Sequence, residues 1–202
     1  MADTAGQNEG NSDGPVTPFG VNHIVIHVRD IEESHRFWTE ILGLRQVGEF
    51  KSQAAGVPKR STMRFYSGDR GGPIHHHDIA LIENPALQTP SAGGPPSAIV
   101  HIAFAMADRE AWLRQLAFLQ RKGVKFERRV EHGITHSVYI RDPNGHGIEL
   151  LYELPREVWE GDLDAALNHY VALPTEGPEA LEDHTETPMF ARDQTTAGAE
   201  RA

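Results

Sequence analysis

Residues 21–30, VNHIVIHVRD, decide the fold, because the same pattern returns at residues 99–108 as IVHIAFAMAD. In both segments a histidine opens a short apolar run and an aspartate closes it, and the copies are 78 residues apart. Short apolar runs with β-branched residues are typical of strands. An aspartate directly after such a run favours an N-cap, since its carboxylate accepts from the free N–H groups of a following helix. The repeat therefore predicts two copies of a strand that leads into a capped helix.

The repeat extends beyond each cap. Apolar residues at helical spacing predict helices over residues 31–42 and 109–122, and Gly43 and Gly123 follow where helices commonly end. Three strand-like segments come after each helix, at residues 46–50, 60–66 and 77–82 in the first copy and at 125–129, 135–141 and 147–152 in the second. The predicted fold class is α+β: two paired βαβββ modules (19–83 and 97–154) that form a curved mixed sheet around a metal-containing cavity.

The flanking segments read differently. Residues 1–18 and 184–202 are rich in small, polar and charged residues, which predicts disordered ends. Residues 155–183 form an acidic extension, and its apolar spacing predicts an amphipathic helix over residues 159–172.

Composition narrows the class of function. A formal net charge of −10 is unfavourable for nucleic acid or an anionic membrane surface, so neither is an expected partner. The chain has no cysteine, so any metal site must use histidine nitrogen and carboxylate oxygen. The first 18 residues have neither a basic start nor an apolar run, so we expect no signal peptide or membrane anchor and a soluble, cytoplasmic protein.

The two copies differ at one position that carries chemistry. The last strand of the first copy contains Ile-Ala-Leu (79–81), whereas that of the second contains Ile-Glu-Leu (148–150), so Glu149 corresponds to Ala80. A carboxylate inside an apolar strand is costly without a positive partner. His23 and His101 occupy matched first-strand positions, although a single strand histidine is more often a packing residue. Together the three side chains predict one divalent ion with open coordination positions for ligands.

Residues 23–30, HIVIHVRD, and 139–149, YIRDPNGHGIE, resemble the vicinal oxygen chelate superfamily, which includes glyoxalases, extradiol dioxygenases and bleomycin-binding proteins. The resemblance covers about residues 19–154 and is greatest to single-domain type I extradiol dioxygenases. In that family His23, His101 and Glu149 would match the iron triad.

The resemblance also implies roles for other residues. His77, in the segment HHDIAL (76–81), would match the catalytic acid–base histidine, and a slip of one residue would give that role to His76. Tyr139 would contact the substrate and favour its ionised form by donating a hydrogen bond. His132, at the start of the same strand region, is a candidate substrate-binding residue.

The implied function is an extradiol dioxygenase that uses Fe(II), with Mn(II) as an alternative ion, to cleave a catechol with O2. A homo-oligomer, a dimer or larger, is expected.

Two alternative functions stay open. One is a glyoxalase-like metal-dependent isomerase or lyase, although Ala80 cannot supply the fourth ligand that such enzymes generally use. The other is a metal-free binding protein for small molecules such as drugs.

Overall fold

The computed structural model describes residues 18, 20–50, 62–72, 76–88, 99–184 and 187–191. The chain is a mixed α+β structure with two sheets. The predicted disordered ends fall almost entirely outside the described residues. Within the described residues, no helix is both long enough and apolar enough to cross a membrane.

The first module has the predicted βαβββ order, and a π-helical turn, η1, extends its helix. Its elements are β1 (Ile24–Val28), α1 (Ile31–Arg36), η1 (Phe37–Ile41), β2 (Arg45–Glu49), β3 (Met63–Ser67) and β4 (Ile79–Glu83). The sheet order is β1-β4-β3-β2, with β1 parallel to β4 and the other pairs antiparallel.

The second module repeats this topology and adds a strand. Its elements are β5 (Ile102–Ala105), α2 (Arg109–Arg121), β6 (Arg128–His132), β7 (Thr135–Arg141) and β8 (Gly147–Glu153). A later strand, β9 (Tyr170–Leu173), pairs antiparallel with β6, which gives the order β5-β8-β7-β6-β9. The predicted α+β fold of two βαβββ modules is therefore confirmed, with the strands divided between two mixed sheets of four and five strands.

The local signals in the repeat act as expected. Asp30 accepts from the backbone N–H groups of Glu32 and Glu33, and Asp108 accepts from that of Ala111. Gly43 and Gly123 both have positive φ, which a residue without a side chain adopts at no steric cost. An aspartate N-cap therefore begins the helix in both copies, and a glycine follows the end of each helix.

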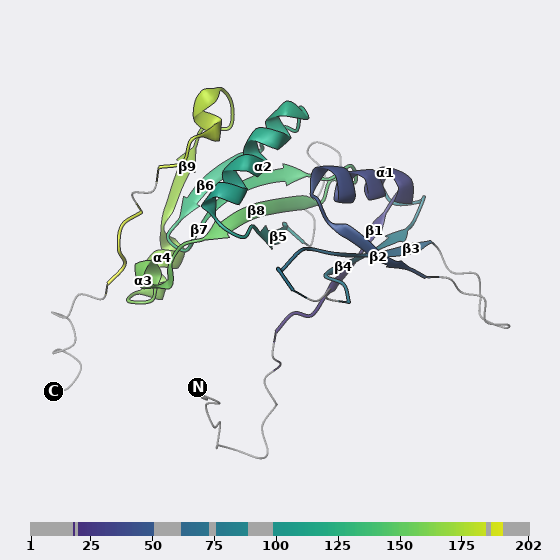
Figure 1. Ribbon diagram of the computed structural model, residues 1–202, viewed down its shortest axis with the longest axis horizontal. Helices are drawn as coiled ribbons and strands as arrows, with labels where there is room; N and C mark the ends of the chain where they lie inside the picture. Colours follow the sequence, from purple (N-terminus) through teal and green to yellow (C-terminus); the bar gives the residue numbers. More distant parts are fainter. Residues whose placement is uncertain are drawn as a thin grey trace, which may run out of the picture.

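The two helices lie on the same side of the two sheets (Figure 1). The buried residues of these helices recur at helical spacing, as predicted. They are Ile31, Ser34 and Trp38 in the first copy and Trp112, Leu116 and Leu119 in the second. The Trp112 indole N–H donates to the Leu150 carbonyl at 2.8 Å, which ties α2 to β8. Two shorter helices, α3 (Arg156–Trp159) and α4 (Leu163–Asn168), lie away from α2 near the ends of β6 and β7, and α4 packs against β6 (Figure 1).

A buried asparagine joins the modules. The side-chain oxygen of Asn144, in the turn between β7 and β8, accepts from the Arg29 backbone N–H at 2.7 Å, and its amide donates to the Ser34 hydroxyl at 3.0 Å. Gln115 on α2 adds a bond to the Ile41 carbonyl at 2.9 Å. These contacts hold the start of the first helix against the second module.

The predicted helix over residues 159–172 is wrong. The segment contains two short helices, α3 (Arg156–Trp159) and α4 (Leu163–Asn168), and then β9. Asp162 caps a new helix by accepting from the Ala165 N–H, so the first helix does not continue through Gly161. The sequence Tyr-Val-Ala-Leu at 170–173 instead pairs with the open edge of β6, because backbone pairing satisfies that edge.

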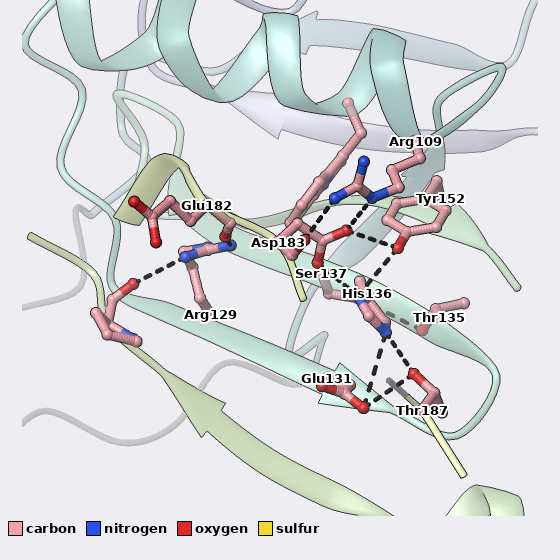
Figure 2. Close-up of polar contacts among 12 residues, drawn as sticks. Arg109, Arg129, Glu131, Thr135, His136, Ser137, Tyr152, Glu182, Asp183 and Thr187 are labelled. Carbon is pink, nitrogen blue, oxygen red and sulfur yellow. Dashed lines mark hydrogen bonds and ion pairs between the residues drawn. The ribbon is translucent and has the colours of Figure 1, made fainter. Parts of the chain in front are cut away.

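A C-terminal strap, the described residues 174–184 and 187–191, lies on the helix-covered face of the second sheet and includes the short 3₁₀ helix η2 (Pro178–Leu181). Its anchor is Asp183, whose side chain is fully buried and accepts from Arg109, His136 and Tyr152 at 2.7, 2.7 and 2.8 Å (Figure 2). Burial alone would raise the pKa of Asp183, but these hydrogen bonds outweigh it and lower the pKa below its ordinary value.

Nearby, Arg129 donates to the carbonyl oxygens of Pro174, Glu179 and Glu182. His136 also contacts the Thr187 hydroxyl at 2.9 Å, and that hydroxyl donates to Glu131. Residue 187 therefore lies in an ordered contact, although a disordered tail was predicted from residue 184.

Asp183→Asn tests the anchor. The change removes the buried carboxylate that binds His136, Tyr152 and the half-exposed Arg109, so we expect a loss of about 3 kcal/mol in unfolding free energy at pH 7 by urea denaturation. Because the native pKa is lowered, the contribution of Asp183 is present at neutral pH and is lost as pH falls through that value. The difference between wild type and variant should therefore shrink below about pH 4.

Asp164→Asn is a matched control, since Asp164 is exposed on α4. It should change stability by no more than about 0.5 kcal/mol. Equal effects of the two substitutions would show that the Asp183 network does not anchor the strap.

Candidate metal centre

The strand registers align the two modules residue by residue. Val25 on β1 lies opposite Ala80 on β4, and Ala103 on β5 lies opposite Glu149 on β8. Val25 comes two residues after His23, and Ala103 comes two residues after His101. Ala80 therefore occupies the position in the first module that Glu149 occupies in the second, as the sequence comparison predicted.

His101 and Glu149 meet on the face of the second sheet opposite α2. The imidazole Nε2 lies 2.9 Å from Oε2 of the carboxylate, whose residue is only 6% exposed. Two ligand atoms that each lie about 2.1 Å from one ion, at a right angle, would be roughly 3 Å apart. The observed separation therefore fits two neighbouring ligands of one divalent ion, and the ion would supply the positive charge that a buried carboxylate needs.

Tyr139 is bound to the other carboxylate oxygen. It lies opposite Glu149 in the β7–β8 pairing, and its hydroxyl donates to Oε1 at 2.8 Å. Burial, with a smaller effect from the bond to Glu149, raises the pKa of Tyr139 to about 12. The phenol thus keeps its proton at neutral pH and can serve as a hydrogen-bond donor in the site.

His132 completes this group. Its Nε2 lies 3.2 Å from the Tyr139 hydroxyl, which can accept from the imidazole while it donates to Glu149. Burial lowers the pKa of His132, which favours the neutral ring. We call His101, His132, Tyr139 and Glu149 the second-module half-site.

The other predicted residues gather in the first module. The ring of His23 lies 4.4 Å from that of His77, and His23 Nδ1 lies 2.8 Å from the Asn22 side-chain oxygen. Nδ1 atoms of His76 and His77 are 2.8 Å apart, and the His77 ring also contacts Phe65. We call His23, His76 and His77 the first-module histidine cluster.

The two groups are not joined within this chain. Across the described residues, no three histidine, aspartate or glutamate side chains lie close enough together to hold an ion. His23 lines a cavity of about 570 Å³ between the modules, whereas His101 and Tyr139 line a different one of about 250 Å³. The structure thus brings together two of the three predicted ligands, and the participation of His23 and His77 stays a prediction.

Two features of the half-site escaped sequence analysis. The guanidinium of Arg128 lies over the Tyr139 ring, 3.9 Å from its centroid, because the two residues are opposite each other in the β6–β7 pairing. A Cβ atom on Gly147 would lie 2.3 Å from the Val100 carbonyl oxygen and 3.2 Å from His101 Cα. The contact of Arg128 with Tyr139 could have been predicted only from the register of β6 and β7. That register was not available from the sequence, because β6 begins at residue 128 and not at residue 125 as predicted.

Comparisons with known proteins agree with this architecture. A family profile described as Glyoxalase/Bleomycin resistance protein/Dioxygenase superfamily matches residues 20–150. Biphenyl-2,3-diol 1,2-dioxygenase 3 of Rhodococcus globerulus is 27% identical over 135 residues, which are 67% of this chain and 63% of the relative. Lactoylglutathione lyase of Schizosaccharomyces pombe is 22% identical over 152 residues, 67% of this chain and 48% of the relative.

A solved structure, the glyoxylase/bleomycin resistance protein/dioxygenase domain from Frankia sp. EAN1pec, aligns with a TM-score of 0.52. It is 18% identical, and the alignment covers 68% of this chain and 100% of that domain, so it supports the fold alone. The chain spans about half to two thirds of the length of the two curated relatives.

Gly147→Ala tests whether the close approach of the two strands builds the half-site. The added Cβ would collide with backbone at Val100 and should displace His101 from Glu149. We expect Zn(II) affinity, measured by calorimetry, to fall by about tenfold or more, with little change in far-UV circular dichroism.

Gly72→Ala is the matched control, because a Cβ there meets no atom within 4 Å. It should leave Zn(II) affinity unchanged. If Gly147→Ala retained full affinity with an intact fold, His101 and Glu149 would not be joint ligands.

Proposed function

We propose that this chain, which belongs to the Glyoxalase/Bleomycin resistance protein/Dioxygenase superfamily, is an Fe(II)-dependent extradiol dioxygenase acting on a catechol-type diol. The observation that carries the proposal is the second-module half-site, in which His101 and Glu149 present two ligand atoms 2.9 Å apart beside a protonated tyrosine. Ala80 stands where a fourth protein ligand would be, so three ligands leave room for both a diol and dioxygen.

In this proposal His101, Glu149 and His23 hold the ion. Fe(II), or Mn(II) in its place, supplies the redox chemistry that inserts both oxygen atoms of O2 while the ring bond beside the diol breaks. The protein supplies the rest. The strands of the second sheet hold the ligand atoms on a rigid framework, which keeps the open side of the site in a fixed geometry.

Tyr139 and His132 would act on the diol itself. A phenol that keeps its proton can donate to a substrate oxygen and stabilise that oxygen in its ionised form. His132 lies within hydrogen-bond distance of the same hydroxyl and can help to orient it. His77 is the proposed acid–base residue, and its role requires that the first-module histidine cluster approach the half-site.

We also propose that a second copy of the chain brings the two groups together. Within one chain the described residues leave His23 apart from the His101–Glu149 pair. Both groups, however, lie at matched positions on the two modules. A homo-oligomer in which the first module of one copy faces the second module of another would supply His23 of the partner subunit to the half-site.

The second candidate is a glyoxalase-like isomerase or lyase, which the similarity to a lactoylglutathione lyase favours. The same ion and ligands could serve it, but Ala80 leaves the ion one protein ligand short of the set that such enzymes generally use. Dependence on oxygen separates the two candidates.

Anaerobic loading with Fe(II), followed by a catechol and then air, is the decisive test. We expect a yellow ring-fission product and O2 uptake to appear together in equal amounts. Glu149→Gln should abolish both signals and metal retention, whereas Glu153→Gln, at an exposed position on the same strand, should preserve them. Metal-dependent turnover of an α-ketoaldehyde adduct without oxygen would support the isomerase instead.

Subunit mixing tests the source of the third ligand. His23→Ala and Glu149→Ala should each be inactive as homo-oligomers. If His23 of the partner subunit completes the site, unfolding and refolding the two variants together should restore part of the activity, since some sites then contain all three ligands. If mixing restores nothing while both variants still associate, His23 joins the site within one chain or does not join it.

A further inference from the structure

The Arg128 guanidinium is placed at the edge of the half-site. Its carbon lies 3.9 Å from the centroid of the Tyr139 ring, and the His101 ring approaches the same phenol edge-on at 5.4 Å. Arg128 and His101 thus both contact the Tyr139 ring. Arg128, Tyr139 and His101 also line one cavity of about 250 Å³.

The charge of Arg128 is not neutralised by the residues that surround it. Within the part of the chain that the structure describes, no carboxylate pairs with it, although its neighbour Arg141 is bound to Glu127 at 2.7 Å. The guanidinium lies against the same phenol whose hydroxyl donates to Glu149, so its charge is close to the half-site. The cavity is lined by two arginines, Arg128 and Arg141, and by one carboxylate, Glu127, so its lining carries a positive balance in a chain whose net charge is −10.

The position of the Arg128 guanidinium over the Tyr139 ring favours the binding of an anionic group. An arginine over an aromatic ring keeps its planar group in a fixed orientation, with N–H donors directed outward. Such a group binds carboxylates through two parallel hydrogen bonds. A cationic cavity on an acidic surface also concentrates anionic ligands near the site.

We infer that Arg128 determines substrate specificity by binding an anionic substituent, so that the substrate is a catechol with a carboxylate on its ring or on a short side chain. The inference rests on the proposed function of the half-site. The diol would lie at His101 and Glu149, its ring would lie along Tyr139, and its carboxylate would reach the guanidinium. Arg128 lies within the matched family region, but a role for it does not follow from the ligand pattern.

Two substrates of similar shape test the inference: protocatechuate, which carries a carboxylate, and the catechol with a methyl group at the same ring position. Arg128→Gln should lower kcat/KM for protocatechuate by about tenfold to a hundredfold, mainly through KM, because a charged hydrogen-bonded pair is lost. For the methyl compound we expect a change of no more than about twofold. Arg128→Lys, which keeps the charge without the planar fork, should lie between.

Arg114→Gln is the matched control for net charge, since Arg114 is exposed on α2 and pairs only loosely with Glu110. It should leave both substrates unaffected. The preference for protocatechuate should also weaken as salt is added, because the attraction is partly screened. A loss that is equal for the two substrates would mean that Arg128 only supports Tyr139, and it would overturn the inference while the dioxygenase proposal stands.

A binding measurement separates this inference from the proposed function. Zn(II) has no redox chemistry, so calorimetry on Zn(II)-loaded protein reports ligand binding without turnover. Tighter binding of protocatechuate than of the methyl compound, removed by Arg128→Gln, would support the inference even if neither compound were oxidised. Equal binding of the two compounds would overturn it.

Discussion

The contact between His101 and Glu149 is the constraint on which the rest of the site depends. A carboxylate at 6% exposure within a β-strand is costly unless it is hydrogen-bonded or paired, and the His101 Nε2 atom lies 2.9 Å from it. Gly147 allows the segment before β5 to approach β8 closely enough for that contact. Tyr139 then satisfies the second carboxylate oxygen, so the pair is held on three neighbouring strands.

The two modules share a topology but differ in their candidate ligands and in the segments packed against them. Ala80 replaces the carboxylate in the first module, and the first-module cluster contains only histidines. The second module carries the half-site and also receives the extension, with β9 on its edge and the strap on its helix-covered face (Figures 1 and 2). The strap therefore lies on the other side of the second sheet from the half-site.

Particular residues show what the sequence could predict. Asp30 and Asp108 cap helices, the tryptophan stripes are buried, and β7 runs from Thr135 to Arg141 as predicted, because caps and periodicity act over a few residues. The helix predicted through Tyr170 is wrong, since the open edge of β6, far away in the sequence, outweighed local periodicity. The joint ligation by His23, His101 and Glu149 remains a prediction.

By itself the sequence determined the duplicated βαβββ order, the boundaries of the two repeated helices and the chemical types of the candidate ligands. All of these follow from short-range patterns that a repeat reinforces. Only the tertiary structure decided which side chains meet: His101 with Glu149, Arg128 over Tyr139, and Asp183 with His136. Those contacts depend on strand register and on segments that are distant along the chain, and period-two alternation gives the face of a residue but not its partner.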